Sequence, residues 1–245
     1  MRVATSPTSW QNLSPSDWSR ASALLRELRA VRAARRFTDF ARLVYPRYED
    51  AAHLRILAEK LEAVERGDIT RLIVTMPPRH GKTWTTSHLF PSWFLGRNSE
   101  RYVIAATYAQ DFADDIGRAV RNIIAGEEFA EAFPSCKLAD DNASIRRFST
   151  NHGGSYFAVG AGGPITGRGA DLLLIDDPIK GREDADSETM RRQLRDWYTA
   201  VAYTRLMPGG RVVLIQCLAG DTAIAMENGG NKGLDRIQPG DQLLS

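Results

Sequence analysis

Four short apolar runs constrain the fold of this chain more than any other feature of its sequence. They are "RLIVTM", "RYVIAATY", "DLLLIDD" and "GGRVVLIQ", at residues 71–76, 101–108, 171–177 and 209–216. Strands that are continuously apolar, rather than alternating, are typical of parallel sheets covered on both faces. The segments between the runs have apolar residues at helical spacing, and alternating strands and helices favour an α/β fold. We therefore predict a mostly parallel central sheet flanked by helices.

Helices are predicted around this sheet at residues 14–37, 51–68, 109–126 and 187–206. Ser14 or Ser16 is suited to cap the first helix, and Gly67 is suited to close the second. The stretch "SIRRFSTNHGGSYFAVG", residues 144–160, predicts a β-hairpin that turns at its glycines.

Charge and cysteine content restrict the class of protein. The net formal charge is only +2, and the arginine-rich stretch at residues 19–47 has two readings, a solvated helix face or a surface near DNA phosphates. Cys136 and Cys217 offer neither a disulfide framework nor metal-ligand spacing, which fits a reducing cytoplasm. No apolar run approaches the roughly 18 residues that cross a bilayer, so we expect no membrane segment.

The segment "MPPRHGKT" (76–83) predicts a phosphate-binding loop, because it follows a predicted strand and precedes a helix. Backbone N–H groups of the loop and of the helix N-terminus would face the β- and γ-phosphates. Lys82 would add a positive charge, the Thr83 hydroxyl could ligate Mg²⁺, and Gly81 would let the backbone pass close to the nucleotide. Met76 departs from the pattern, since such loops usually begin with glycine.

Pro78, Arg79 and His80 complete the predicted nucleotide-contacting part of the loop. Arg79 could stabilise transition-state charge on the γ-phosphate, as arginine fingers do, or form a structural ion pair. Both roles for Arg79 stay open, whereas His80 is better explained as a structural residue.

Two carboxylates follow the third apolar run, in "DLLLIDDP". Asp176 would emerge at the carboxyl end of a buried strand, where α/β sheets bind ligands, and it suits a magnesium ligand. Asp177 could polarise the attacking water. The alternative for either acid is a turn or helix cap before the proline.

Residues from about 45 to 216 resemble the ATPase domain of a tailed-phage terminase large subunit, a P-loop NTPase that packs DNA into a capsid. The resemblance implies ATP and Mg²⁺ as cofactors, with Lys82 and Thr83 on nucleotide and metal, Asp176 on the metal, and Asp177 as the catalytic carboxylate. It also implies that residues 45–53 lie near the adenine. The segments that carry it, in family order, are "PPRHGKT", "VIAATYAQDFADDIGRAVRNII", "GGPITGRGADLLLIDDPIK", "EDADSETMRRQLRDWY" and "TRLMPGGRVVLIQ".

The same resemblance implies double-stranded DNA, a portal and a small terminase subunit as partners, a homo-oligomeric ring, and the cytoplasm of a bacterial host as location. Two other functions remain open. One is a helicase-like DNA translocase, against which "ITGRGADLLLIDDP" argues. The other is a DNA- or capsid-binding module with an inactive nucleotide site, which Met76 keeps open.

The last apolar run meets Cys217 where the terminase family usually continues into Thr-Arg-Trp-His. From there "CLAGDTAI" and "LDRIQPGDQLLS" resemble the start of an intein, with Asp221 and Thr222 matching its Asp-Thr pair. This implies Gln216–Cys217 as the splice junction, at which the Cys217 side chain would take the Gln216 acyl group as a thioester. The alternative is that Cys217 is a small buried residue at a strand end.

All four histidines precede Cys217, so the histidine and terminal asparagine that inteins need are missing. We expect either the N-terminal half of a split intein, with a complementary fragment as partner, or a truncated gene. The predicted parts are an N-terminal helical, mobile segment (1–44), the P-loop ATPase domain (45–216), and a short β-rich intein fragment (217–245). The nuclease domain that usually follows a terminase ATPase domain is not expected in this chain.

Overall fold

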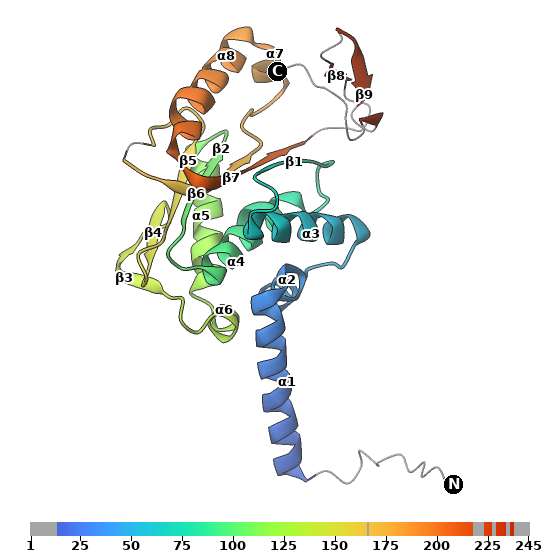
Figure 1. The fold of residues 1–245 in the computed structure, drawn as a ribbon, viewed down its shortest axis with the longest axis vertical. Coiled ribbons are helices and arrows are strands. Elements are labelled where there is room, and N and C mark those ends of the chain that lie inside the picture. Colours follow the sequence, from blue (N-terminus) through green and yellow to red (C-terminus); the bar gives the residue numbers. More distant parts are fainter. Residues whose placement is uncertain (1–13, 166, 218–222, 227–228, 234–235, 238–245) are drawn as a thin grey trace.

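A seven-stranded sheet forms the centre of the protein, in the order β1-β7-β6-β2-β5-β4-β3. The computed structural model describes residues 14–165, 167–217, 223–226, 229–233 and 236–237 (Figure 1). The strands of the sheet are β1 (Arg71–Thr75), β2 (Tyr102–Thr107), β3 (Leu138–Ala143), β4 (Arg147–Thr150), β5 (Ser155–Gly160), β6 (Ala170–Asp176) and β7 (Leu206–Gln216). A separate antiparallel pair consists of β8 (Ala223–Ala225) and β9 (Asn231–Gly233).

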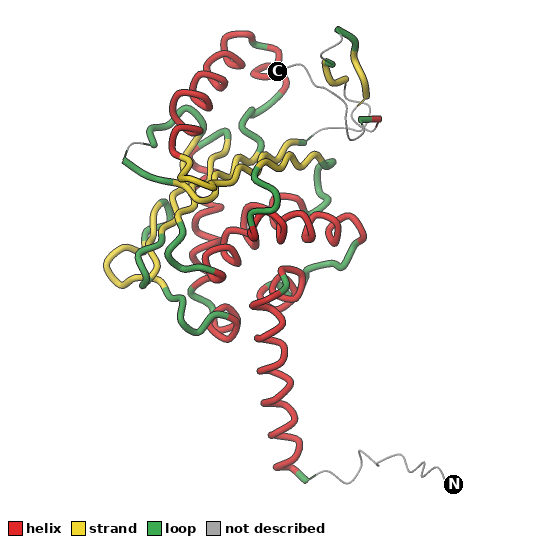
Figure 2. The backbone as a smooth tube through the Cα atoms, viewed as in Figure 1, coloured by secondary structure: helices red, strands yellow, loops and turns green. Residues whose placement is uncertain are grey.

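The helices before β2 are α1 (Pro15–Arg35), α2 (Phe37–Val44), α3 (Ala52–Arg66), the π-helix η2 (Trp84–Leu89) and α4 (Phe90–Arg97). Those after β2 are α5 (Gln110–Ile124), α6 (Glu127–Ala132), α7 (Arg182–Asp186), α8 (Glu188–Trp197), the π-helix η3 (Tyr198–Ala202) and the 3₁₀-helix η4 (Tyr203–Arg205). Figure 2 shows them as red coils around the yellow strands. None of the helices in the described part of the chain is both long and apolar enough to cross a membrane.

The predicted α/β fold is confirmed. All four apolar runs are strands, and β1, β7, β6, β2 and β5 pair in parallel. Successive residues of β6 enter different apolar cores: Leu172 and Leu174 pack on one side of the sheet, and Leu173 and Ile175 on the other. This burial on both faces explains why the runs are continuously apolar. The predicted hairpin is also confirmed, since β4 pairs antiparallel with β5.

The first predicted helix is divided at Arg36, which has an extended backbone (φ −123°) between α1 and α2. The break turns Phe37 and Phe40 into the main core, where both are fully buried. The side chain of Glu62 accepts the Phe37 N–H at 2.8 Å and the Arg36 guanidinium at 3.2 Å. Tertiary packing, rather than a helix-breaking residue, therefore ends α1.

Helix α1 extends away from the body of the protein (Figure 1). Ser14 caps its N-terminus in a capping box with Asp17, so the first of the two predicted caps is confirmed. Strand β3 was not predicted, because "LADDNA" has residues with low strand propensity, and it pairs with β4 at the edge of the sheet. The predicted mobile start of the chain, residues 1–13, lies outside the described residues.

Helix α5 lies close to the sheet at Gly117. A Cβ atom at this position would be 2.1 Å from the Ile145 backbone oxygen and 3.3 Å from the Ala158 Cβ. The absence of a side chain therefore sets how closely α5 packs against β5.

Substitution Gly117→Ala should lower the free energy of unfolding by about 1–3 kcal/mol, because overpacking outweighs the better helix propensity of alanine. Chemical denaturation with matched m-values measures the change. Gly181→Ala is the control: its added methyl would meet no atom within 4 Å, so stability should stay within about 0.5 kcal/mol. Equal effects of the two substitutions would contradict the close approach.

Candidate nucleotide-binding site

Three parallel strands end side by side at one edge of the sheet. Strand β7 lies between β1 and β6, with Thr75 opposite Gln216 and Asp176 opposite Ile215. Because all three run in the same direction, the residues that follow them emerge together, where parallel sheets bind ligands.

These following residues are the phosphate-binding loop (76–83) after β1, Asp177 after β6 and Cys217 after β7. The Asp177 N–H donates to the Ile215 carbonyl at 2.9 Å, which ties the end of β6 to β7. The predicted loop, the predicted acids and the predicted splice junction thus share one location.

The loop turns through two residues with positive φ, Arg79 (64°) and Gly81 (79°). The following helix begins at once: Thr85 N–H donates to the Gly81 carbonyl at 3.0 Å, and the Thr86 hydroxyl donates to the Lys82 carbonyl at 2.7 Å. The next residues form the π-helix η2, a form that is frequent at functional sites. A non-glycine residue at positive φ is strained, and such strain clusters in ligand-binding loops.

Lys82 is the central cation of this edge, and its side chain is only 6% exposed. Its Nζ lies 2.6 Å from Asp177 Oδ2 and also donates a hydrogen bond to Cys217 Sγ. Burial alone would lower the pKa of Lys82, but Asp177 and Cys217 together raise the pKa above its usual value. The ammonium therefore stays charged and ready to bind an anion.

Asp176 is fully buried. Its Oδ2 accepts the Ser87 hydroxyl at 2.5 Å, and its Oδ1 has no hydrogen-bond partner among the described residues. Burial raises the pKa of Asp176, and the hydroxyls of Ser87 and Thr83 act in the opposite direction. A buried carboxylate with one free oxygen beside a threonine hydroxyl fits a hard cation such as Mg²⁺.

Asp177 differs from its neighbour in both exposure and contacts. Its side chain is 26% exposed and its φ is 43°. Its Oδ1 accepts the Cys217 backbone N–H at 2.7 Å, and its Oδ2 accepts the Lys82 ammonium and the Cys217 thiol. The two consecutive acids therefore face different partners, since Asp176 contacts η2 and Asp177 contacts the loop lysine and the end of β7.

A hollow of about 300 Å³ adjoins the loop, between α3, η2 and the chain before α3. The Tyr45 ring stacks on Trp84 with centroids 4.6 Å apart and 9° between the planes, and Trp84 lies 4.5 Å from His88. Burial lowers the pKa of His88 to about 4, so the ring is neutral at pH 7. The predicted adenine-contacting segment lines this hollow together with Arg79, His80 and Gly81.

Hydrogen bonds within the loop account for His80. Its Nδ1 lies 2.9 Å from the Pro78 carbonyl oxygen, and its own carbonyl oxygen is 3.2 Å from His53 Nε2. Arg79 lines the hollow and has no ion pair with another described residue. The structure therefore gives His80 a positioning role and leaves the Arg79 guanidinium facing the site.

Two residues of the site were missed by sequence reasoning. Ser87 holds Asp176, and Trp84 stacks on Tyr45. The spacing of Thr83 and Ser87, four residues apart after the loop, could have indicated a shared helix face. Asp221, Thr222 and most of the predicted second intein segment lie outside the described residues.

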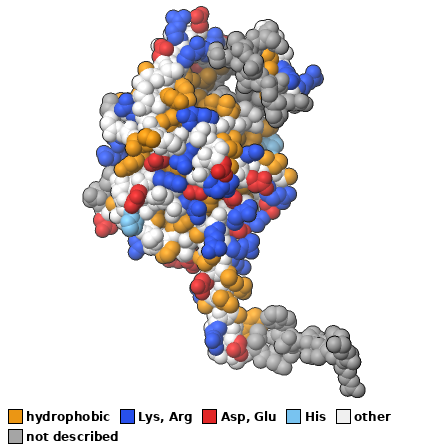
Figure 3. Space-filling model, viewed as in Figure 1, with side chains coloured by type: hydrophobic (Ala, Val, Ile, Leu, Met, Phe, Trp, Pro, Cys, Tyr) orange, Lys and Arg blue, Asp and Glu red, His pale blue; other side chains and the backbone are white. Residues whose placement is uncertain are grey.

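The arginine-rich segment is partly neutralised by acids. Arg32 pairs with Asp39 at 3.2 Å, and Arg36 pairs with Glu62 at 3.2 Å. Figure 3 shows acidic side chains interspersed with the Lys and Arg side chains on the face in view. These contacts are those of a solvated, ion-paired helical surface.

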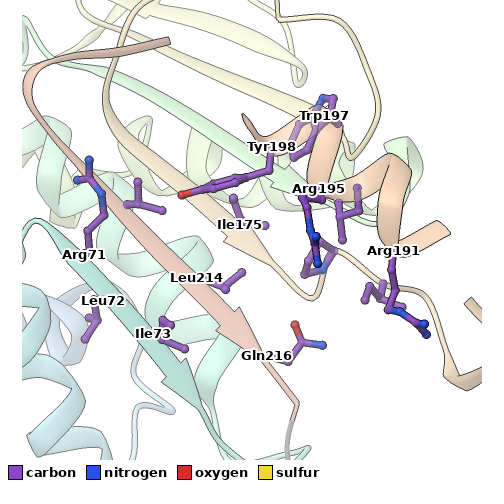
Figure 4. Close-up of a pocket in the computed structure, with 14 residues that line it drawn as sticks. Arg71, Leu72, Ile73, Ile175, Arg191, Arg195, Trp197, Tyr198, Leu214 and Gln216 are labelled. Carbon is purple, nitrogen blue, oxygen red and sulfur yellow. The ribbon is translucent and has the colours of Figure 1, made fainter. Parts of the chain in front are cut away.

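A second hollow lies on the sheet face between β1, β7 and α8 (Figure 4). It is a groove of about 380 Å³ with apolar walls that include Ile73, Leu214 and Tyr198, and Gln216 stands at the end of β7 beside it. Ile73 is 64% exposed. The groove lacks the paired lysine and carboxylates of the edge, so phosphate chemistry belongs to the edge.

Comparisons with known proteins agree on one family. A profile of the family described as "Terminase large subunit, T4likevirus-type, N-terminal" matches residues 73–208. A comparison with curated protein sequences gives no significant match.

Solved structures of large terminases are similar to this chain at low identity. The ATPase domain of the Thermus phage P74-26 large terminase aligns at 15% identity and a TM-score of 0.47, over 74% of this chain and 69% of that one. The HK97 bacteriophage large terminase aligns at 12% and 0.47, over 80% and 38%. A large terminase of a thermophilic bacteriophage, in complex with ATP-gamma-S, aligns at 14% and 0.34, over 64% and 37%. The chain thus spans less than half the length of the last two.

Substitution Asp176→Asn should raise the free energy of unfolding by about 1–3 kcal/mol in the absence of Mg²⁺ and nucleotide, because it removes a buried charge with an unpaired oxygen. A carboxyl group with a raised native pKa loses its stabilising contribution as pH rises through that pKa. The gain should therefore grow with pH, as measured by thermal melts in chelator.

Asp171→Asn is the matched control, at the partly exposed start of the same strand, where the side chain accepts the Tyr102 N–H at 2.8 Å. Its stability should stay within about 0.5 kcal/mol of the parent. A melting temperature for Asp176→Asn below that of the parent would mean that the buried carboxylate is already compensated.

Proposed function

This chain belongs to the T4likevirus-type terminase large subunit family, in its N-terminal part, and from that premise we propose that it is the ATP-hydrolysing domain of a DNA-packaging motor. The observation that carries the proposal is the arrangement at the carboxyl edge of the sheet. There the buried Lys82 ammonium lies 2.6 Å from Asp177, next to Asp176 with its unpaired oxygen. One cation and two acids of distinct environment are what nucleotide–metal chemistry requires.

The loop from Pro78 to Thr83 is proposed to hold the phosphates. Its strained turn leads directly into a helix N-terminus, which favours anions. The stacked Tyr45 and Trp84 rings offer a flat surface of the kind that adenine binds. Thr83 and Asp176 are proposed to hold Mg²⁺, which would neutralise charge on the phosphates.

Asp177 is proposed to accept a proton from the attacking water, since it is the more exposed of the two acids and carries its carboxylate at the loop. Arg79 is proposed to stabilise charge on the transferred phosphoryl group, because its guanidinium faces the site without a described ion-pair partner. Lys82 would exchange its contact with Asp177 for the phosphates when nucleotide binds.

The partners proposed for the whole motor follow from the family. They are double-stranded DNA, the phage portal, a small terminase subunit and further copies of this chain in a ring, within the cytoplasm of a bacterial host. The competing functions, a helicase-like translocase and an inactive DNA- or capsid-binding module, differ in activity. Turnover of ATP that DNA stimulates excludes the inactive module, and strand separation would be required of a helicase.

The domain organisation is proposed to be a helical segment (1–44), the ATPase domain (45–216) and an intein fragment (217–245). Support for the last comes from the change in sequence character at Cys217 and from its position at the end of β7. Cys217 is proposed to attack the Gln216 carbonyl, forming the thioester and releasing the peptide nitrogen as an amine. A complementary fragment would supply the missing histidine and asparagine.

Substitution Lys82→Ala should weaken Mg-ATP binding by about 10- to 100-fold, the scale of a lost charge-assisted hydrogen bond. Asp177→Asn should bind at least as well as the parent, because Asp177 competes with phosphate for Lys82, but should hydrolyse ATP at least about 100-fold more slowly. Equilibrium binding and single-turnover hydrolysis are measured separately.

Lys60→Ala, on the exposed face of α3, is the control for loss of a lysine and should match the parent in both assays. Parent-like binding by Lys82→Ala would mean that the nucleotide, if it binds, lies elsewhere. Equal loss of binding in Lys82→Ala and Asp177→Asn would remove the proposed division of roles.

Mixing the chain with a complementary fragment should transfer residues 1–216 to that fragment, with the new peptide bond directly after Gln216. The thiolate is the attacking species, so the rate should rise as pH approaches the usual thiol pKa of about 8.5. Intact-mass spectrometry identifies the product.

Cys217→Ala is the control variant and should give no joined product. A joint at any other residue, or ligation by Cys217→Ala, would refute the intein assignment. A chain that no complementary fragment joins would support the truncated-gene alternative.

A further inference from the structure

The side chain of Cys217 lies inside the candidate phosphate site. Its sulfur accepts a hydrogen bond from Lys82 Nζ, and its thiol donates to Asp177 Oδ2 at 3.2 Å. Its backbone N–H donates to Asp177 Oδ1 at 2.7 Å. Three contacts with two residues of the site therefore fix the first residue after β7.

This position follows from the sheet and does not depend on the splicing proposal. Gln216 is paired with Thr75, the last residue of β1, so the residue after Gln216 must emerge beside the start of the loop. The hydrogen bond from Asp177 N–H to the Ile215 carbonyl brings the acid to the same point. Whatever residue follows Gln216 will therefore contact Lys82 and Asp177.

The donors of Lys82 are limited. An ammonium has three N–H groups, and in this structure one points to Asp177 and one to Cys217. The side chain is 6% exposed, so the ammonium has little freedom to turn toward new partners. A phosphate that binds Lys82 must therefore displace one of these acceptors.

We propose that the Cys217 side chain competes with nucleotide phosphate for Lys82, so that this chain binds nucleotide more weakly than one whose residue 217 cannot accept a hydrogen bond. The inference rests on the proposed nucleotide site. It makes the identity of the residue after Gln216 a determinant of nucleotide affinity. Coupling of this kind is reciprocal, so bound nucleotide equally releases Cys217 from Lys82.

The test is a titration of the full-length chain with Mg-ATP, comparing the parent with Cys217→Ala and Cys217→Ser. Cys217→Ala should bind about three- to tenfold more tightly, because a methyl group cannot accept from Lys82. Cys217→Ser retains an acceptor and should stay within about twofold of the parent. Ser19→Ala, on α1, is the control for loss of a small polar group and should match the parent.

Cys217 is exposed, so all variants should melt at the temperature of the parent. Equal or weaker Mg-ATP binding by Cys217→Ala would overturn the inference and leave the nucleotide site standing. Binding by Cys217→Ala alone would support the inference in its strongest form. Absence of binding in the parent and in every variant would overturn the proposed function, and this inference with it.

Discussion

The parallel pairing of β7 between β1 and β6 is the constraint on which the rest of the site depends. It fixes which residues emerge together: the phosphate-binding loop, the two acids and the residue after Gln216. A shift of β7 by one residue would exchange its two faces and would also move the end of β7 away from Lys82. The burial of β6 on both faces, in two separate cores, resists such a shift.

The charges of the site are arranged for ligands rather than for stability. Lys82 is compensated by Asp177, whereas Asp176 keeps an oxygen without a described partner in a fully buried position. Uncompensated buried charge costs folding free energy, which a bound cation would offset. The positive φ of Arg79 and Asp177 adds local strain at the same edge. Such features are what a site retains when it must bind a charged nucleotide and a metal.

Much of the fold could be predicted because its signals are local. Continuous apolar runs identify strands buried on both faces, and strand, loop, Lys-Thr and helix in sequence identify the loop. The division of the first helix at Arg36 could not be predicted, since it depends on Glu62, which is distant in sequence. The π-helix after Thr83 changes which side chains share a face, so the placement of Ser87 and His88 was also hidden.

The contact between Lys82 and Cys217 joins residues 135 positions apart and requires the strand order of the sheet. Apolar patterning predicts that strands exist but does not order them, so the sequence placed the splice junction at a strand end and not in the phosphate site. The roles of Arg79 and Asp177 likewise depend on orientation around a ligand. Sequence could name the residues of this site, and the fold is needed to show that they are neighbours.

A crystal structure of the chain with Mg²⁺ and a non-hydrolysable ATP analogue tests the central claim most directly. The account predicts phosphate oxygens on Lys82 and the loop, the cation on Thr83 and on the free oxygen of Asp176, and Cys217 displaced from Lys82. The base should lie against Tyr45 and Trp84. A nucleotide seated in the apolar groove beside Ile73, or a cation away from Asp176, would contradict it.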